Sequence, residues 1–177
     1  MINTSKLLAA AAAAALAMLP STAAAGGGNK GNIVAGAVKS KDHQTLVAAV
    51  KAAGLVDTLA SGGPFTLFAP TDAAFAKLPA GTVDKLLDPA NRDQLRAVLT
   101  YHVVPGKVTA RRLVKLVQDS GGKAALTTVQ GGILTASLSG SSVVITDAAG
   151  GTARVTSGDL IQSNGIIHVT DAVSLPM

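Results

Sequence analysis

The residues of this sequence that are best suited to acid–base chemistry surround one histidine near its C-terminus. In the segment SNGIIHVTDAVSLP, residues 163–176, His168 is accompanied by Ser163, Asp171 and Ser174, which are the residue types of a serine hydrolase. Successive side chains of a strand face opposite sides, so His168 and Asp171, three positions apart, would point away from each other. The spacing argues against a catalytic triad, and we expect no catalytic residues and no enzyme activity.

Sites for cofactors or metal ions are not indicated by the sequence either. It contains no G-x-S-x-G, H-E-x-x-H or P-loop motif, and it has no cysteine, which removes thiol catalysis and cysteine-based metal sites. The spacing of His43, His102 and His168 does not suggest zinc, and residues 147–159 lack the alternating oxygen ligands of a calcium loop. We therefore expect no cofactor and no metal ion.

The histidines are better explained as structural residues. A single histidine in an apolar strand is usually buried and hydrogen-bonded, so we predict that His168 contacts either the turn at Thr71 and Asp72 or a backbone carbonyl. His102 lies on the apolar side of a predicted helix and is expected to be structural. His43 is expected to be exposed near the start of another helix.

The composition narrows the class of partner. The aromatic residues are one tyrosine and three phenylalanines, with no tryptophan, so the chain lacks the stacking platforms that single-stranded nucleic acids and many sugars require. The formal net charge is +5, and all ten acidic residues are aspartates. This mild basicity is compatible with an acidic polysaccharide or an acidic lipid surface, and we expect no nucleic acid partner.

The N-terminal sequence predicts export. Residues 1–25 combine a lysine near the start, an apolar segment and three final alanines, which is the pattern of a signal peptide. Residues 26–31, GGGNKG, predict a flexible leader, and residues 32–177 predict one domain. No segment is long and apolar enough for a transmembrane helix, so we expect a secreted or periplasmic protein.

The order of elements predicts an α+β domain. Helical patterns dominate up to residue 118, with Asp42 as the expected N-cap and Gly54 as the expected C-cap of an early helix. The segment PFTLFAPT predicts one buried strand with Leu67 and Ala69 on one face and Phe68 on the other. After residue 122, short β-type runs separated by glycine-rich turns predict a meander that ends with the strand of His168.

One predicted helix, residues 109–118, is strongly amphipathic. Its apolar side should face the core, so we predict that its basic side is exposed whatever the function is. With a lysine just before the helix, this side is the densest charge cluster of the chain and the first candidate for an acidic partner; its residues are Lys107, Arg111, Arg112 and Lys115.

Three segments together resemble the motifs of the fasciclin domain family. They are TLFAPTDAAF (66–75), YHVVPG (101–106) and NGIIHVTDAVSLP (164–176), in that order and spacing. The resemblance implies a twisted β-sandwich or wedge with an N-terminal helical layer over residues 32–177. It also implies adhesion or association with an extracellular matrix rather than catalysis.

The resemblance assigns two kinds of residue. The first and last motifs are interpreted as architectural, with Thr71, Asp72, Asn164, Gly165 and His168 as structural residues. In animal matrix proteins with this domain, integrin binding involves the Tyr-His region and an Asp-Ile pair before the last motif. The matching candidates for partner binding here are Tyr101, His102, Asp159 and Leu160, although for Asp159 a cap of a turn or bulge is the favoured interpretation.

These expectations combine into one functional hypothesis. The sequence predicts a secreted or periplasmic monomer that acts as an adhesion or interaction module, with envelope or matrix proteins or an acidic polysaccharide as partners. Two alternatives stay open at this point. The Ala/Val/Leu-rich interior could leave a pocket and make the protein a carrier of a small apolar ligand, or the chain could be a hydrolase.

Overall fold

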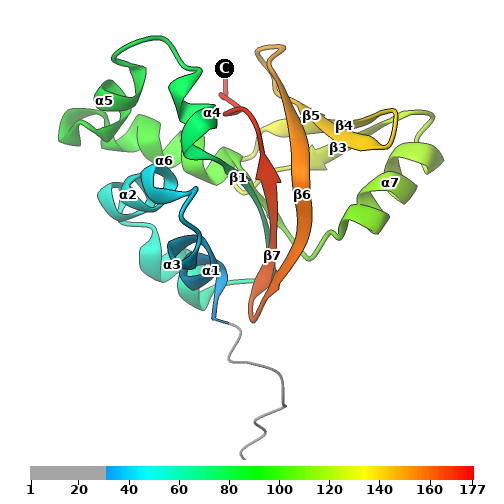
Figure 1. The fold of residues 1–177 in the computed structure, drawn as a ribbon, viewed down its shortest axis with the longest axis horizontal. Helices are drawn as coiled ribbons and strands as arrows, with labels where there is room; N and C mark the ends of the chain where they lie inside the picture. The colour runs from blue at the N-terminus through cyan, green and yellow to red at the C-terminus, as the bar shows by residue number, and fades with distance from the viewer. Residues whose placement is uncertain (1–30) are drawn as a thin grey trace, which may run out of the picture.

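The computed structural model describes residues 31–177 (Figure 1). The predicted signal peptide, residues 1–25, and all but the last residue of the predicted leader, residues 26–31, lie outside the described residues. Helices cluster on one side of a twisted sheet, and a single helix lies near the other end of the sheet. The predicted α+β class is confirmed.

The helices fall into two groups. Among residues 31–177, six α-helices, α1 to α6, and one 3₁₀ turn pack together, whereas α7 packs against β3, β4 and β5 (Figure 1). Within residues 31–177, every helix falls short of the length and apolar character that crossing a bilayer requires. The helices are α1 (Ile33–Lys39), α2 (Gln44–Ala53), α3 (Val56–Ser61), α4 (Asp72–Ala76), α5 (Thr82–Leu87), η1 (Pro89–Asn91), α6 (Arg92–Tyr101) and α7 (Ala110–Asp119).

The described strands form one seven-stranded sheet in the order β2-β1-β7-β6-β5-β4-β3. Neighbours are antiparallel except β1 and β7, the first and last strands, which pair in parallel. Register shifts in β6 mark bulges, which bend a sheet and increase its twist. The strands are β1 (Phe65–Pro70), β2 (Val103–Pro105), β3 (Lys123–Thr127), β4 (Ile133–Ser139), β5 (Ser142–Thr146), β6 (Thr152–Gln162) and β7 (Gly165–Thr170).

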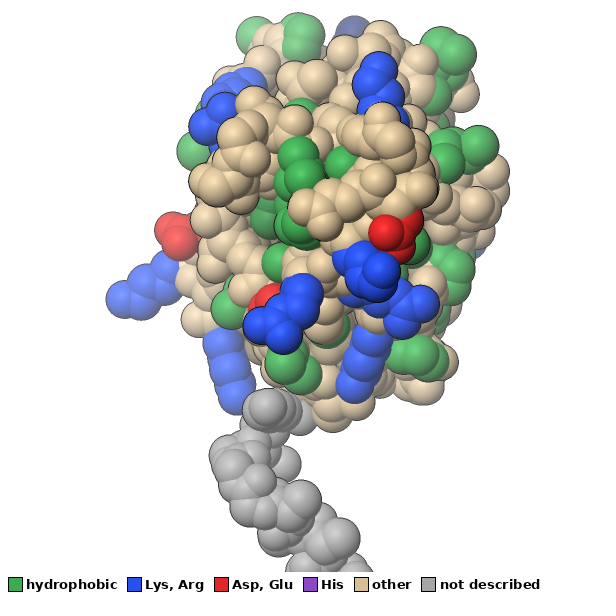
Figure 2. All heavy atoms as spheres, turned by 90° about the vertical axis from the view of Figure 1, so that its right-hand side faces the viewer, with side chains coloured by type: hydrophobic (Ala, Val, Ile, Leu, Met, Phe, Trp, Pro, Cys, Tyr) green, Lys and Arg blue, Asp and Glu red, His purple; other side chains and the backbone are tan. Residues whose placement is uncertain are grey.

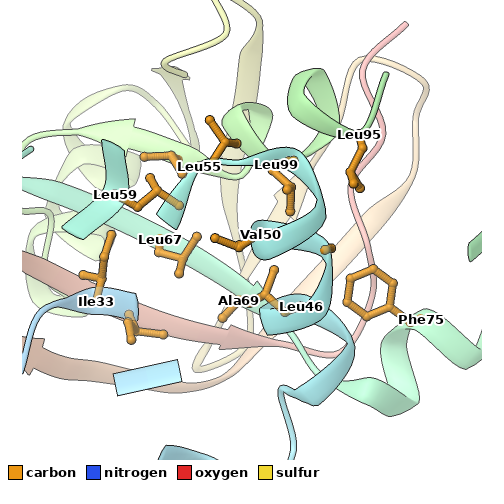
Figure 3. Close-up of a cluster of buried hydrophobic side chains, with 14 residues drawn as sticks. Ile33, Leu46, Val50, Leu55, Leu59, Leu67, Ala69, Phe75, Leu95 and Leu99 are labelled. Carbon is orange, nitrogen blue, oxygen red and sulfur yellow. The ribbon is translucent and has the colours of Figure 1, made fainter. Parts of the chain in front are cut away.

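Two apolar clusters form the core. The first joins the helical layer to β1 and β7 and includes Leu67 and Ala69 (Figure 3). The second lies between α7 and the strands β3, β4 and β5, and it includes Phe68, Leu113 and Val117. Because successive side chains of β1 enter different clusters, the alternation predicted for this strand is confirmed, and β1 connects the two halves of the core.

The start of α2 differs from its prediction. Gly54 ends the helix with a left-handed φ of 68°, as expected, but Asp42 is not the cap. Asp72 of α4 supplies the cap instead, because its Oδ1 accepts the N–H of Thr45 over 2.7 Å. The expectation that His43 is exposed is wrong: this N-cap residue is 3% exposed, with its Nδ1 2.7 Å from Oγ of Ser40.

Candidate functional site

The Tyr101 side chain is enclosed at the C-terminal end of α6. Its hydroxyl donates to the carbonyl of Ile133 over 2.8 Å and accepts the N–H of Ala148 over 2.9 Å. The phenol therefore joins α6 to β4 and to the turn after β5. Burial raises the pKa of Tyr101, because a buried phenolate would lose its hydration.

His102 uses both ring nitrogens to connect α6 to the C-terminal segment. Its Nε2 accepts the N–H of Ser174 over 3.0 Å, which places the proton on Nδ1, and Nδ1–H donates to the carbonyl of Val98 over 2.7 Å. Burial lowers the pKa of His102 and keeps the ring neutral. As the chain is folded here, neither Tyr101 nor His102 presents its side chain to a partner, because both are enclosed.

Asp147 extends this network, and no sequence motif marked it. One carboxylate oxygen accepts the N–H of Gly151 over 2.6 Å, and the other accepts the N–H of Leu175 over 3.0 Å. An aspartate at the end of a strand and before a glycine-rich turn is the available signal for the first contact. The second contact joins positions 28 apart and has no local signature.

His168 is completely buried between β1, β6 and the segment before α7. Its Nε2–H donates to the carbonyl of Val108 over 2.7 Å, and its ring stacks on Phe68 with 5.5 Å between centroids. Of the two partners predicted for this histidine, the structure contains the backbone carbonyl. Burial lowers the pKa of His168, and among the described residues Nδ1 has no hydrogen-bond partner.

The residues around His168 do not form a catalytic triad. The carboxylate of Asp171 accepts the backbone N–H of Arg154 over 2.8 Å, and Ser174 contacts His102 through its own N–H. The imidazole of His168 instead contacts a carbonyl that cannot serve as a nucleophile. Among residues 31–177, no three histidine or aspartate side chains converge on a position suitable for a metal ion.

The architectural residues of the first and last motifs fix the ends of helices. The hydroxyl of Thr71 accepts the N–H of Ala74 over 3.2 Å, which caps α4. Burial alone would raise the pKa of Asp72, but hydrogen bonds from Thr45 and Gln44 outweigh it and lower the pKa. The carboxylate of Asp72 is thus held charged at the positive end of α2.

Asn164 joins the helical layer to the sheet. Its Oδ1 accepts the N–H of Ile33 over 2.9 Å, and its Nδ2 donates to the carbonyl of Leu59 over 2.7 Å. At the next residue, Gly165, a Cβ atom would collide with the carbonyl oxygen of Phe65, so the close approach of β1 and β7 requires glycine here. The turn between β6 and β7 is formed by residues 163–164.

Asp159 lies at a bulge of β6 and contacts the start of α7. It has a left-handed φ of 59°, and its Oδ1 accepts the N–H of Ala110 over 2.8 Å. A carboxylate at this position interacts favourably with the positive end of the helix dipole. Asp159 therefore fits the bulge-cap interpretation, while its neighbour Leu160 is 41% exposed.

The basic side of α7 is open to solvent, as its amphipathic pattern predicted. Lys107, Arg111, Arg112 and Lys115 are exposed, whereas Leu113 and Val117 on the opposite side are buried in the second core cluster. Figure 2 shows that lysine and arginine side chains gather on the lower half of this face of the molecule and outnumber the acidic ones. Lys115 pairs with Asp119 over 2.9 Å, so the excess charge rests on the two arginines and Lys107.

The outer face of the strands β3 to β6 forms a second exposed feature. A cavity of about 550 Å³ lies over this face, on the side of the sheet away from the second core cluster. Sequence patterns gave no separate indication of it, since its residues come from four strands and the C-terminal segment. They are Lys123, Ser137, Ser139, Val144, Thr146, Thr152, Arg154 and Asp171.

Comparison with known proteins identifies related chains. The family model described as Fasciclin domain matches residues 41–176. Protein sll1483 of Synechocystis sp. is 49% identical over 144 residues, which cover 81% of this chain and 73% of the relative. The cell surface glycolipoprotein MPB83 of Mycobacterium bovis is 35% identical over 122 residues, covering 69% of this chain and 48% of the relative.

A solved structure has the same fold. It is a FAS1 domain pair from the insect cell adhesion molecule fasciclin I, and it superimposes with a TM-score of 0.70 at 22% sequence identity. The match covers 81% of the present chain and 50% of the solved one, so this chain spans half the length of that structure.

Proposed function

This chain belongs to the fasciclin domain family, and from that premise we propose that it is an adhesion or interaction module of the cell envelope or extracellular matrix, working without a cofactor. The observation that carries the proposal is the inward orientation of the side chains that could do chemistry. Tyr101, His102 and His168 are buried and bind backbone groups, so they hold the fold together. A partner would therefore contact the exposed outer faces of the domain.

Two relatives support this assignment by their names. One is called a cell surface glycolipoprotein, and the solved structure comes from a cell adhesion molecule. By analogy, we propose that residues 1–25 are removed on export, that residues 26–31 form a leader, and that residues 32–177 act as a secreted or periplasmic monomeric domain. N-terminal sequencing of the exported protein tests the cleavage site, and a chain that keeps residues 1–25 in the membrane fraction would contradict it.

We propose the basic side of α7 as the surface for acidic partners. Arg111 and Arg112 project from a helix that Leu113 anchors in the core, so their positions are defined without a ligand. Asp159 bonds to Ala110 at the start of the same helix, and the next residue, Leu160, is exposed, so we propose both as further candidates for contact with a partner.

A direct binding measurement tests the function. The mature protein is applied to immobilised envelope proteins and to extracellular polysaccharide, each at about 0.1 M and about 0.5 M salt, where the screening length falls from about 10 Å to a few Å. We expect retention that weakens with salt, and weaker retention of the triple variant R111Q/R112Q/K115Q. If the protein is retained on neither material and an apolar ligand co-purifies with it in mass spectrometry, the carrier alternative would be favoured.

A further inference from the structure

The outer face of β3 to β6 is organised as rows of side chains that run across the strands. The pairing places Lys123, Ser137, Val144 and Arg154 side by side on four neighbouring strands. The neighbouring row on the same face lies two residues along each strand and contains Thr135, Thr146 and Thr152. Residues at the alternate positions, such as Leu126, Leu134 and Ile145, point into the second core cluster, so the rows face outward.

The two cations of this face are free to bind an anion. Among the described residues, the only ion pair joins Lys115 to Asp119, so neither Lys123 nor Arg154 is paired with a carboxylate. They stand three strand spacings apart, about 14 Å along the sheet. Two anionic groups on one extended molecule could therefore be bound together, whereas a single small ion could not reach both.

The groups between the cations are suited to sugar hydroxyls. Ser139, Thr146 and Thr152 line the cavity and make no side-chain hydrogen bond to other described residues, so their hydroxyls can both donate and accept. Asp171 borders the cavity beside Arg154, and its Oδ1 accepts the N–H of that residue over 2.8 Å. A carboxylate acceptor here favours a ligand with hydroxyl groups over one composed only of phosphates.

We propose that this outer face, the β3–β6 groove, binds an acidic polysaccharide whose sugars carry carboxylate groups. Lys123 and Arg154 would bind carboxylates on two separate sugars, and the serine and threonine hydroxyls with Asp171 would bind the sugar hydroxyls between them. The groove has no aromatic residue for stacking, so charge should contribute most of the affinity. The proposal deepens the proposed function by naming a ligand class and a site separate from α7, which packs on the inner face of these strands.

The test uses polygalacturonate as the acidic probe, dextran as the neutral one and inorganic polyphosphate as an anion without hydroxyl-bearing sugars. The variant K123Q/R154Q is compared with K39Q/K85Q, which removes the same charge from exposed lysines elsewhere. We expect the groove variant to bind polygalacturonate about tenfold more weakly or worse, with the control within about twofold of the wild type. Both variants should unfold at the same urea concentration as the wild type.

A second variant distinguishes sugar recognition from simple attraction of anions. T146V removes a hydroxyl and keeps the branched shape, so it should weaken binding of polygalacturonate and leave binding of polyphosphate unchanged. Equal binding by K123Q/R154Q and the wild type would overturn the proposal, as would polyphosphate binding as tight as that of polygalacturonate. If R111Q/R112Q alone abolishes binding, the groove is wrong while the proposed function stands, and if no polysaccharide binds, only protein partners are left for it.

Discussion

The backbone N–H of Ser174 donates to Nε2 of His102 over 3.0 Å, although the two residues are 72 positions apart. This bond anchors the segment after β7 to the end of α6. The other ring nitrogen of His102 binds the carbonyl of Val98. One side chain therefore holds together the last turn of a helix and the end of the chain.

His102→Ala should lower the free energy of unfolding by about 2–4 kcal/mol. The change removes a buried ring and leaves the N–H of Ser174 without its acceptor. Urea unfolding followed by circular dichroism measures the loss, and hydrogen exchange at Ser174 should accelerate more than exchange in β4. A loss below about 0.5 kcal/mol, the size of a typical surface change, would contradict the anchoring role.

His168→Ala should cost about 1–3 kcal/mol, because it opens a void beside Phe68 and leaves the carbonyl of Val108 unpaired. His168→Gln offers a matched control, since its amide can still donate to that carbonyl. Binding to any partner should decrease only as far as folding does. A fully stable glutamine variant that no longer binds its partner would show that His168 has a role beyond structure.

The free energy of unfolding should depend on pH near neutrality through both buried histidines. Burial lowers the pKa of His102 and His168 below the ordinary value of 6.5, so below that pH the unfolded chain binds more protons than the folded one. The free energy of unfolding should keep its full value above about pH 6.5. It should decrease as the pH falls below that value, by at most about 1.4 kcal/mol per pH unit for each histidine. Urea titrations between about pH 7.5 and 5 should show a shallower slope in His102→Gln and His168→Gln; identical slopes would refute the assignment.

Asp72→Ala should lower the free energy of unfolding by about 1 kcal/mol through loss of the cap on α2. Asp42→Ala is the control, since Asp42 precedes the same helix and its carboxylate is not the cap. Because the folded pKa of Asp72 lies below 3.8, the difference between variant and wild type should persist above about pH 4 and disappear as the pH falls through the folded value. A larger loss in the Asp42 variant would reverse the assignment.

How far the fold could be predicted depended on whether a partner lies nearby in the sequence. The amphipathic pattern of α7 and the αL cap at Gly54 are local signals, and both predictions are confirmed. The cap of α2 comes from Asp72, 27 positions beyond Thr45, and a scan for local capping residues selects Asp42 instead. The sequence likewise contains no local signal that the side chain of His43 is buried.

The two candidate surfaces also differ in whether their residues are close together in the sequence. The basic side of α7 is contained in one helical period and could be recognised at once, whereas the β3–β6 groove assembles residues from four strands whose register the sequence does not reveal. The Tyr-His motif was identifiable, but Tyr101 is enclosed by hydrogen-bond partners that are distant in sequence. They are Ile133, 32 positions away, and Ala148, 47 positions away. Motif spacing cannot show whether such a side chain faces solvent or the core.

The parallel pairing of β1 with β7 determines when the sheet can be completed during folding. β7 follows the other described strands in sequence, yet it occupies an interior position between β1 and β6, so the sheet cannot be completed until residues 165–170 are in place. Contacts between segments so distant in sequence slow folding, since a long loop must close before they form. Until β7 is in place, the pair β2-β1 and the meander β6-β5-β4-β3 remain two separate pieces of sheet, so this single strand makes one sheet of them.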